Sequence, residues 1–187
     1  MSKERIEEAF REIDRSKFLP KSLRKYSNLD QPLFIGGGQT ISQPSTVKLM
    51  LEWLDVKDGN KVLDVGSGSG WTSALLSNLV GKNGKVIAAE RIPELMIFGK
   101  NNAQKMRLNN IKFILGDGKL GYMQDAPYDR ILVSASGTRI PDELIKQLKI
   151  GGKLVIPINN DIIEIKKISD SKVETIKHPG FIFVPLI

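Results

Sequence analysis

The expected fold depends on one stretch, Val62-Leu63-Asp64-Val65-Gly66-Ser67-Gly68-Ser69-Gly70-Trp71, in which a short apolar run passes into closely spaced glycines and then into a helical pattern. Glycine lacks a Cβ, so this turn can adopt backbone angles closed to other residues and let a ligand approach the main chain. The dinucleotide fingerprint G-x-G-x-x-G would need glycine where Trp71 stands, and no Gly-Lys-Ser/Thr follows to make a P-loop. The stretch therefore predicts a nucleotide-like ligand and disfavours NAD.

Strand and helix patterns alternate on both sides of this turn. Strands are predicted at 61–65, 85–89, 111–115, 130–134 and 153–157, and helices at 71–79, 93–106 and 141–148, the last ending before Gly151-Gly152. This alternation is typical of right-handed crossovers that build a parallel sheet. We therefore expect an α/β fold with a Rossmann-like, doubly wound, mostly parallel sheet.

The two ends of the chain differ from this core. Apolar residues at helical spacing predict a first amphipathic helix behind a Ser2 cap, then a loop rich in proline and glycine, then a second helix opened by Pro44. Near the other end, 162–168 and 181–186 are strand-like and predict antiparallel strands at one sheet edge. The expected division of the single domain 1–187 is a helical cap at 1–60, a ligand-binding core at 61–157 and C-terminal strands at 158–187.

Two acidic residues stand where a nucleotide would be bound. Glu90 ends the strand after the glycine turn, where a carboxylate can accept hydrogen bonds from both ribose hydroxyls. Asp117, within Gly116-Asp117-Gly118, follows the next strand and could accept from an adenine amino group. An acid at a strand end is often only a solvated carboxylate, and Asp-Gly is also a common turn pair.

Composition narrows the classes of function. The 187 residues include no cysteine, which excludes disulfides, thiolate zinc sites and a cysteine nucleophile. His178, the single histidine, lies beside Pro179-Gly180, so we expect a loop position there and no metal site. The net charge is +7, and an acid-free stretch with Lys100, Lys105, Arg107 and Lys112 could meet nucleic acid, although a solvated helix face is the simpler interpretation.

The sequence gives two indications of cellular location. No apolar run reaches the roughly 20 residues that a membrane span needs. The start, MSKERIEEAF, is charged rather than a basic and then apolar leader. We therefore expect a cytoplasmic protein without a membrane partner.

Several motifs together resemble a known enzyme family. The glycine stretch resembles the first motif of class I S-adenosylmethionine methyltransferases. The segment Ile35-Gly36-Gly37-Gly38-Gln39-Thr40-Ile41-Ser42-Gln43-Pro44 closely resembles the signature of protein-L-isoaspartate O-methyltransferases. Further matches follow in the family's order over nearly the whole chain: the region 15–20, Glu90-Arg91-Ile92-Pro93-Glu94-Leu95, Gly116-Asp117-Gly118, Ala126-Pro127-Tyr128-Asp129, Ile140-Pro141, Gln147-Leu148, Gly151-Gly152 and Phe183-Val184-Pro185-Leu186.

The resemblance implies the class I methyltransferase fold and methyl transfer from S-adenosylmethionine to the α-carboxylate of L-isoaspartyl residues in damaged proteins and peptides. The ester would then cyclise to a succinimide. Ser42 falls on the family's active-site serine, although a serine before a helix can also be an N-cap. The candidate cofactor-binding residues are Thr40, Ile41, Asp64, Gly66, Gly68, Gly70, Glu90, Arg91, Asp117 and Gly118. The resemblance also implies a monomer.

This chain departs from the family pattern at two positions. Ser45 stands where an aromatic residue or histidine is frequent, and Asn159 stands where Pro157-Ile158 would usually be followed by glycine. Both positions lie on the substrate side of the expected fold, so they concern the substrate contacts rather than the cofactor site.

The residue types present suit the implied reaction. A carboxylate has a reference pKa near 3.9, so it is already a nucleophile at neutral pH and needs no general base. A nucleic-acid methyltransferase is a rival interpretation. However, the Asp/Asn-Pro-Pro-aromatic motif of amino-directed enzymes is replaced by Ser134-Ala135-Ser136-Gly137, and C5-directed enzymes need a cysteine. A non-catalytic module that binds S-adenosylmethionine is the other alternative.

Overall fold

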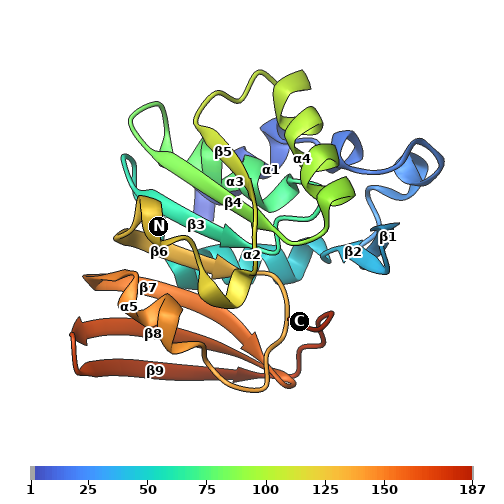
Figure 1. The fold of residues 1–187 in the computed structure, drawn as a ribbon. Coiled ribbons are helices and arrows are strands. Elements are labelled where there is room, and N and C mark those ends of the chain that lie inside the picture. The colour runs from blue at the N-terminus through green and yellow to red at the C-terminus, as the bar shows by residue number, and fades with distance from the viewer. Residues whose placement is uncertain (1–2, 187) are drawn as a thin grey trace.

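The computed structural model describes residues 3–186, and its central element is a seven-stranded sheet with the strand order β5-β4-β3-β6-β7-β8-β9 (Figure 1). Neighbouring strands from β5 to β7 pair in parallel, whereas β8 and β9 pair antiparallel. The predicted mostly parallel sheet with antiparallel edge strands is confirmed. The strands are β3 (Lys61–Val65), β4 (Lys85–Glu90), β5 (Ile111–Leu115), β6 (Tyr128–Val133), β7 (Leu148–Ile158), β8 (Asp161–Ser169) and β9 (Lys172–Pro179).

Helices cover both faces of the sheet, which explains why the central strands carry apolar residues on both faces. Alternate residues of β3 point to opposite faces: Val62 packs in a cluster with the helices of one face, and Leu63 packs with α5 on the other. Both side chains are fully buried. The first face carries α1 (Lys3–Glu12), α2 (Pro44–Leu54), α3 (Trp71–Val80) and α4 (Pro93–Lys105), and the second carries α5 (Asp142–Lys146).

The helix starts follow from local chemistry. Pro44 and Pro93 occupy first helical positions, where a missing backbone N–H costs no hydrogen bond. The predicted cap of α1, Ser2, lies outside the described residues.

The path of the chain opens a crevice at one end of the sheet. From β3 the chain moves outward to β4 and β5, and it then returns to the other side of β3 to form β6 and β7. The loops that leave β3 and β6 therefore diverge, and in open α/β sheets ligands bind at this reversal, beyond the carboxyl ends of the strands.

The segment before α2 is more ordered than the predicted loop. It forms two 3₁₀ helices, η1 (Arg15–Phe18) and η2 (Lys21–Tyr26), and a hairpin of β1 (Leu33–Gly36) and β2 (Gln39–Ile41). Gly37 and Gly38 turn the hairpin with φ of 58° and 71°, a left-handed conformation that favours glycine. The glycines that suggested a loop are in fact the turn between two short strands.

The prediction of a strand at 181–186 is wrong. The last strand is β9, which pairs with β8 after a turn at 169–171, whereas 181–186 runs irregularly and makes only an isolated bridge between Ser136 and Pro185. Most β9 side chains are exposed, so its sequence lacks the apolar alternation that reveals a half-buried strand. His178 consequently lies in this strand rather than in a loop.

The helix predicted at 141–148 is also shorter than expected. α5 ends at Lys146, and β7 begins at Leu148, so Gly151-Gly152 lies inside a strand and does not cap a helix. Gly151 has φ of 80°, close to where the pairing of β6 with β7 shifts register. Gly151-Gly152, which the sequence suggested as the end of a helix, therefore lies where the register of strand pairing shifts.

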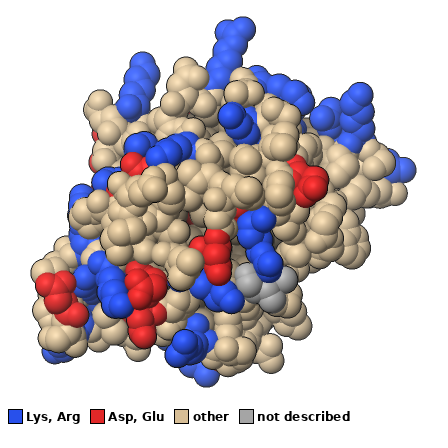
Figure 2. All heavy atoms as spheres, in the orientation of Figure 1, with Lys and Arg blue, Asp and Glu red and all other residues tan. Residues whose placement is uncertain are grey.

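The acid-free basic stretch that contains Lys100, Lys105, Arg107 and Lys112 is a solvated surface. Lys112 pairs with Asp125 at 2.7 Å, and Lys100, Lys105 and Arg107 are exposed. Figure 2 shows Lys and Arg side chains along the upper and right-hand margins of one face, over α4 and the segment before β1. Within residues 3–186, no helix is long and apolar enough to cross a membrane.

Candidate active site

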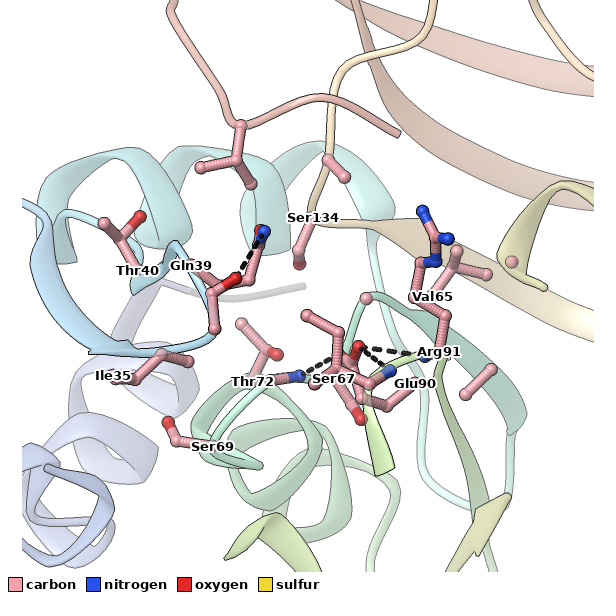
Figure 3. A pocket seen from close by; sticks show the side chains of 18 of the residues that line it. Ile35, Gln39, Thr40, Val65, Ser67, Ser69, Thr72, Glu90, Arg91 and Ser134 are labelled. Atoms are coloured by element: carbon pink, nitrogen blue, oxygen red, sulfur yellow. Dashed lines mark hydrogen bonds between the residues drawn. The ribbon is translucent and has the colours of Figure 1, made fainter. Parts of the chain in front are cut away.

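A cavity of about 350 Å³ lies at the predicted crevice, beyond the carboxyl ends of β3, β4 and β6 (Figure 3). The β1–β2 hairpin closes it on one side, and the C-terminal segment reaches it with Val184, Pro185 and Leu186. Its remaining walls come from the glycine turn, the end of β4 and the loop after β6. The lining includes Thr40, Ile41, Ser42, Gly66, Gly68, Glu90, Arg91, Gly116, Gly118, Ser134 and Ala135.

The glycine turn brings main chain to the cavity wall. Gly66, Gly68 and Gly70 all have positive φ, at 76°, 52° and 86°. A Cβ on Gly68 would lie 3.0 Å from the side chain of Ile35, which also lines the cavity. A side chain at position 68 would therefore narrow the space for a ligand. Gly70 precedes the first turn of α3, and no side chain caps that helix.

Glu90 is held rigidly in the cavity wall. It is 5% exposed, and its carboxylate accepts hydrogen bonds at 2.9 Å from the backbone N–H groups of Gly68, Arg91 and Ile92. Figure 3 shows these bonds joining the end of β4 to the glycine turn. An ionised carboxylate offers about four acceptor positions, so the amides fix its orientation and leave room for a donor from the cavity.

Asp64 lies behind the glycine turn rather than in the cavity wall. Its carboxylate is fully buried and accepts from the hydroxyls of Ser73 at 2.5 Å and Thr72 at 3.0 Å. Burial raises the pKa of Asp64 to about 6, although both hydrogen bonds oppose the shift. Asp64 therefore supports the start of α3, and the structure does not bring its side chain into the cavity.

Ser42 lies in the cavity wall at the end of β2, beside Thr40 and Ile41. The interpretation of Ser42 as a helix cap is wrong, because the N-cap position of α2 is Gln43. The first turn of α2 is instead capped from a distant loop, since Asp30 accepts from the Ser45 N–H at 2.9 Å. No described residue forms a hydrogen bond with the Ser42 hydroxyl, which leaves it free to meet a ligand.

The other candidate residues divide between the wall and its surroundings. Gly118 and Arg91 line the cavity, whereas Gly70 and Asp117 do not. The Asp117 carboxylate caps η3 (Gly118–Leu120) by accepting from the Lys119 N–H at 2.9 Å. Its second oxygen has no hydrogen-bond partner among the described residues, and Asp117 is exposed between two lining residues, Gly116 and Gly118.

Comparison with known proteins identifies the family. The family model described as protein-L-isoaspartate(D-aspartate) O-methyltransferase matches residues 1–187. The chain belongs to this family. A protein-L-isoaspartate O-methyltransferase from Methanothrix thermoacetophila is 46% identical over 187 residues, which cover 98% of this chain and 88% of the relative. The enzyme of the same name from Pyrococcus horikoshii is 43% identical over 189 residues, covering 98% and 85%.

Solved structures of the family share the fold. One protein-L-isoaspartate O-methyltransferase superposes with a TM-score of 0.87 at 31% identity, and the match covers 97% of this chain and 60% of that one. A crystal structure of a family member from Plasmodium falciparum, in complex with S-adenosyl-L-homocysteine, also gives 0.87, at 27% identity and coverage of 98% and 90%. The class I methyltransferase fold predicted from the sequence is confirmed.

One of the two departures from the methyltransferase family pattern has a structural explanation. Asn159, where the family usually has glycine, lies between β7 and β8 with φ of 54°. Asparagine tolerates this left-handed conformation better than most side chains, so the turn is preserved. Ser45 is exposed in the first turn of α2, where its N–H donates to Asp30.

Several residues that shape this methyltransferase site were not predicted from the sequence. Ile35, Ser134 and the segment 184–186 line the cavity. Ile35 and 184–186 belong to stretches that resemble the family, but the resemblance does not mark them as facing a ligand. Gly99 was also missed, although a glycine inside a helical pattern is a signal. A Cβ on Gly99 would lie 2.9 Å from the Gly68 carbonyl oxygen, so α4 packs directly against the glycine turn.

Gly99→Ala is therefore expected to lower both thermal stability and cofactor affinity. In an exposed helix, the same change stabilises by roughly 1 kcal/mol, because alanine has the higher helix propensity. Here the added methyl must displace backbone of the glycine turn, so we expect the opposite sign, with a lower Tm and a cofactor Kd raised several-fold. Differential scanning fluorimetry with and without S-adenosylhomocysteine measures both effects. A higher Tm with unchanged ligand response would show that the contact between α4 and the turn is loose.

Proposed function

We propose that this protein transfers a methyl group from S-adenosylmethionine to the α-carboxylate of L-isoaspartyl residues in damaged proteins and peptides, which begins their repair. One observation carries the proposal: in a chain of this family, a single cavity unites the signature hairpin that ends at Ser42 with the glycine turn and Glu90. The name of the matched family and the S-adenosylhomocysteine bound to its Plasmodium falciparum member support the same activity and cofactor.

The cavity suits S-adenosylmethionine in size and chemistry. Sites for ligands of this kind are typically about 300–1,000 Å³, and this one is about 350 Å³. The fixed Glu90 carboxylate would accept from a ribose hydroxyl, the glycine turn would lie against the ligand, and Asp117 would accept from the adenine amino group. Thr40, Ile41, Arg91 and Gly118 would complete the wall. When bound, the cofactor supplies a methyl group on a positively charged sulfur.

The remaining task of the protein is to orient an ionised nucleophile. Because the isoaspartyl carboxylate has lost its proton at neutral pH, no residue has to remove one. We propose that the unpartnered Ser42 hydroxyl donates a hydrogen bond to this carboxylate and holds one oxygen toward the methyl group. Orientation of this kind can contribute roughly 7–11 kcal/mol to lowering a barrier. The half-buried hairpin and the C-terminal segment would exclude water.

A methylation assay with three substrates tests the activity. We expect labelled methyl from S-adenosylmethionine to appear on an isoaspartyl peptide, and not on its aspartyl twin or on bulk transfer RNA. Label on the RNA alone would favour the nucleic-acid methyltransferase. Binding of S-adenosylmethionine without transfer to any substrate would favour the non-catalytic module.

At saturating cofactor and peptide, kcat is expected to stay nearly flat between about pH 6 and 8, because the substrate carboxylate titrates well below this range. His178→Ala should leave the profile unchanged, since His178 does not line the cavity. This β9 residue instead stacks on Trp53 of α2, with the ring centroids 3.8 Å apart. Asp64 has a pKa raised to about 6, so its protonation would remove negative charge behind the cofactor site.

The variants Asp64→Asn and His178→Ala separate an effect of Asp64 on cofactor binding from an effect of His178 on turnover. A rise in KM for S-adenosylmethionine as pH falls below about 6 should disappear in Asp64→Asn. A fall in kcat with a midpoint near 6.5 that vanishes in His178→Ala would instead show that a histidine base acts.

We also propose that the protein acts as a cytoplasmic monomer and that its single domain divides into a cap at 1–60, a core at 61–157 and C-terminal strands at 158–187. The resemblance to the family supports the monomer. The contribution of Ile35 and Thr40–Ser42 to the cavity supports the role of the cap. Light scattering coupled to gel filtration tests the oligomeric state, and a mass of twice 20.8 kDa would contradict it.

A further inference from the structure

Arg15 binds four backbone carbonyl groups from two separate parts of the chain. Its Nη1 donates to the carbonyl oxygens of Ser27 at 3.0 Å and Leu29 at 3.1 Å, and its Nη2 donates to those of Gln31 at 2.8 Å and Ser42 at 3.0 Å. The side chain is buried. A loop of residues 27–31 is thus tied to Ser42, the residue that directly follows β2.

The shape and charge of the guanidinium explain why arginine suits this position. Its planar group presents several N–H donors in a fixed arrangement, which a lysine ammonium cannot reproduce. It lies 5.4 Å from the centre of the Trp71 ring, at the start of α3. Burial lowers the pKa of Arg15 to about 10, while the nearby Asp30 opposes this shift, so the group stays charged at neutral pH.

The loop that Arg15 holds delivers Asp30 to the start of α2. The Asp30 carboxylate accepts from the Ser45 N–H at 2.9 Å and from the Gln43 side-chain amide at 3.1 Å. These hydrogen bonds keep the pKa of Asp30 below its usual value. Because α2 has no cap from its own N-cap residue, this carboxylate satisfies the helix N-terminus from outside.

We propose that Arg15 and Asp30 are positioning residues that together fix Ser42 for methyl transfer. Arg15 holds the carbonyl of Ser42 itself, and Asp30 holds Gln43 and Ser45, which lie one and three residues after Ser42. Since the Ser42 hydroxyl has no hydrogen-bond partner among the described residues, its position depends on this backbone support. The inference rests on the proposed function of Ser42 and adds the groups through which the fold sets its orientation.

The test is a double-mutant cycle between positions 15 and 42. We expect Arg15→Lys to lower kcat for an isoaspartyl peptide by about 10-fold or more, because one ångström of misplacement can cost about 10²-fold. The calorimetric Kd for S-adenosylhomocysteine should change by less than about twofold. In a Ser42→Ala background, Arg15→Lys should lower kcat little further, since residues that act as a unit are not additive.

Arg130→Lys is the matched control. Arg130 is a half-buried arginine that, like Arg15, donates to backbone carbonyls, those of Asp55 and Asp129, but it lies near the amino end of β6, away from the cavity. We expect this variant to lower Tm without changing kcat in either background. A general loss of rigidity would affect both arginine variants alike.

Asp30→Ala keeps the proposal testable if Arg15→Lys does not fold. Asp30 is exposed, so its removal should leave a folded enzyme with reduced kcat and faster hydrogen exchange at the Ser45 amide. Equal loss of kcat from Arg15→Lys with and without Ser42 would overturn the proposal, as would wild-type kcat in Asp30→Ala.

If the wild-type protein methylates nothing, the proposed function fails. Hydrogen exchange at residues 42–46 then tests separately whether Arg15 and Asp30 hold this segment. Wild-type exchange rates in both Arg15→Lys and Asp30→Ala would overturn the proposal.

Discussion

Glu90→Ala is expected to weaken S-adenosylmethionine binding by roughly 100-fold or more. A hydrogen bond to a charged group is worth about 1.5–3 kcal/mol, and the carboxylate is proposed to accept one from the ribose at its remaining acceptor position. The structure adds a second cause, because the N–H groups of Gly68, Arg91 and Ile92 would lose their shared acceptor. The glycine turn would then lose the contact that shapes it around the cofactor.

Isothermal titration calorimetry with S-adenosylmethionine and S-adenosylhomocysteine measures this effect. Glu90→Gln keeps the shape and one acceptor oxygen, so it should lose less affinity than the alanine variant. Glu94→Ala removes an exposed carboxylate from the first turn of α4, outside the main cavity, and should bind as the wild-type protein does. Unchanged affinity in a folded Glu90→Ala protein would remove this residue from the cofactor site.

Ser42→Ala is expected to lower kcat by about 10²-fold while leaving cofactor affinity nearly intact. Loss of the hydroxyl would let the substrate carboxylate rotate away from the line of methyl transfer, and misplacement of this size has about that cost. Because Ser42 is not the cap of α2, its truncation should not destabilise that helix. The loss should therefore fall on turnover rather than on folding.

Steady-state kinetics with an isoaspartyl peptide, together with a thermal melt, separate the two effects. Ser22→Ala, on the exposed η2 helix, is the control and should retain wild-type kcat and Tm. A wild-type kcat in Ser42→Ala would contradict its proposed role. Loss of cofactor affinity in the same variant would instead indicate that the side chain supports the pocket.

Much of the core could be predicted because local properties of the chain determine it. β3 and β4 are buried, mostly apolar runs, and the proline at the start of α4 marks where that helix begins. Glu90 was found for the same reason, since the end of a strand can be read along the sequence. The hydrophobic pattern did not predict the last strand correctly. β9 exposes most of its side chains and so lacks an apolar alternation, whereas the apolar segment 181–186 forms no strand.

The alternating α/β order, the glycine turn and the acid at the end of the next strand could be predicted from the sequence, because each depends on neighbouring residues. The folded chain was needed to place Asp64 behind the turn, to bring the C-terminal segment to the cavity and to show that Arg15 holds the carbonyl of Ser42. A backbone carbonyl is common to every residue, so no pattern of side chains shows which ones a distant guanidinium will bind. That choice depends on the path of the folded chain, which brings residues 15, 30 and 42 together.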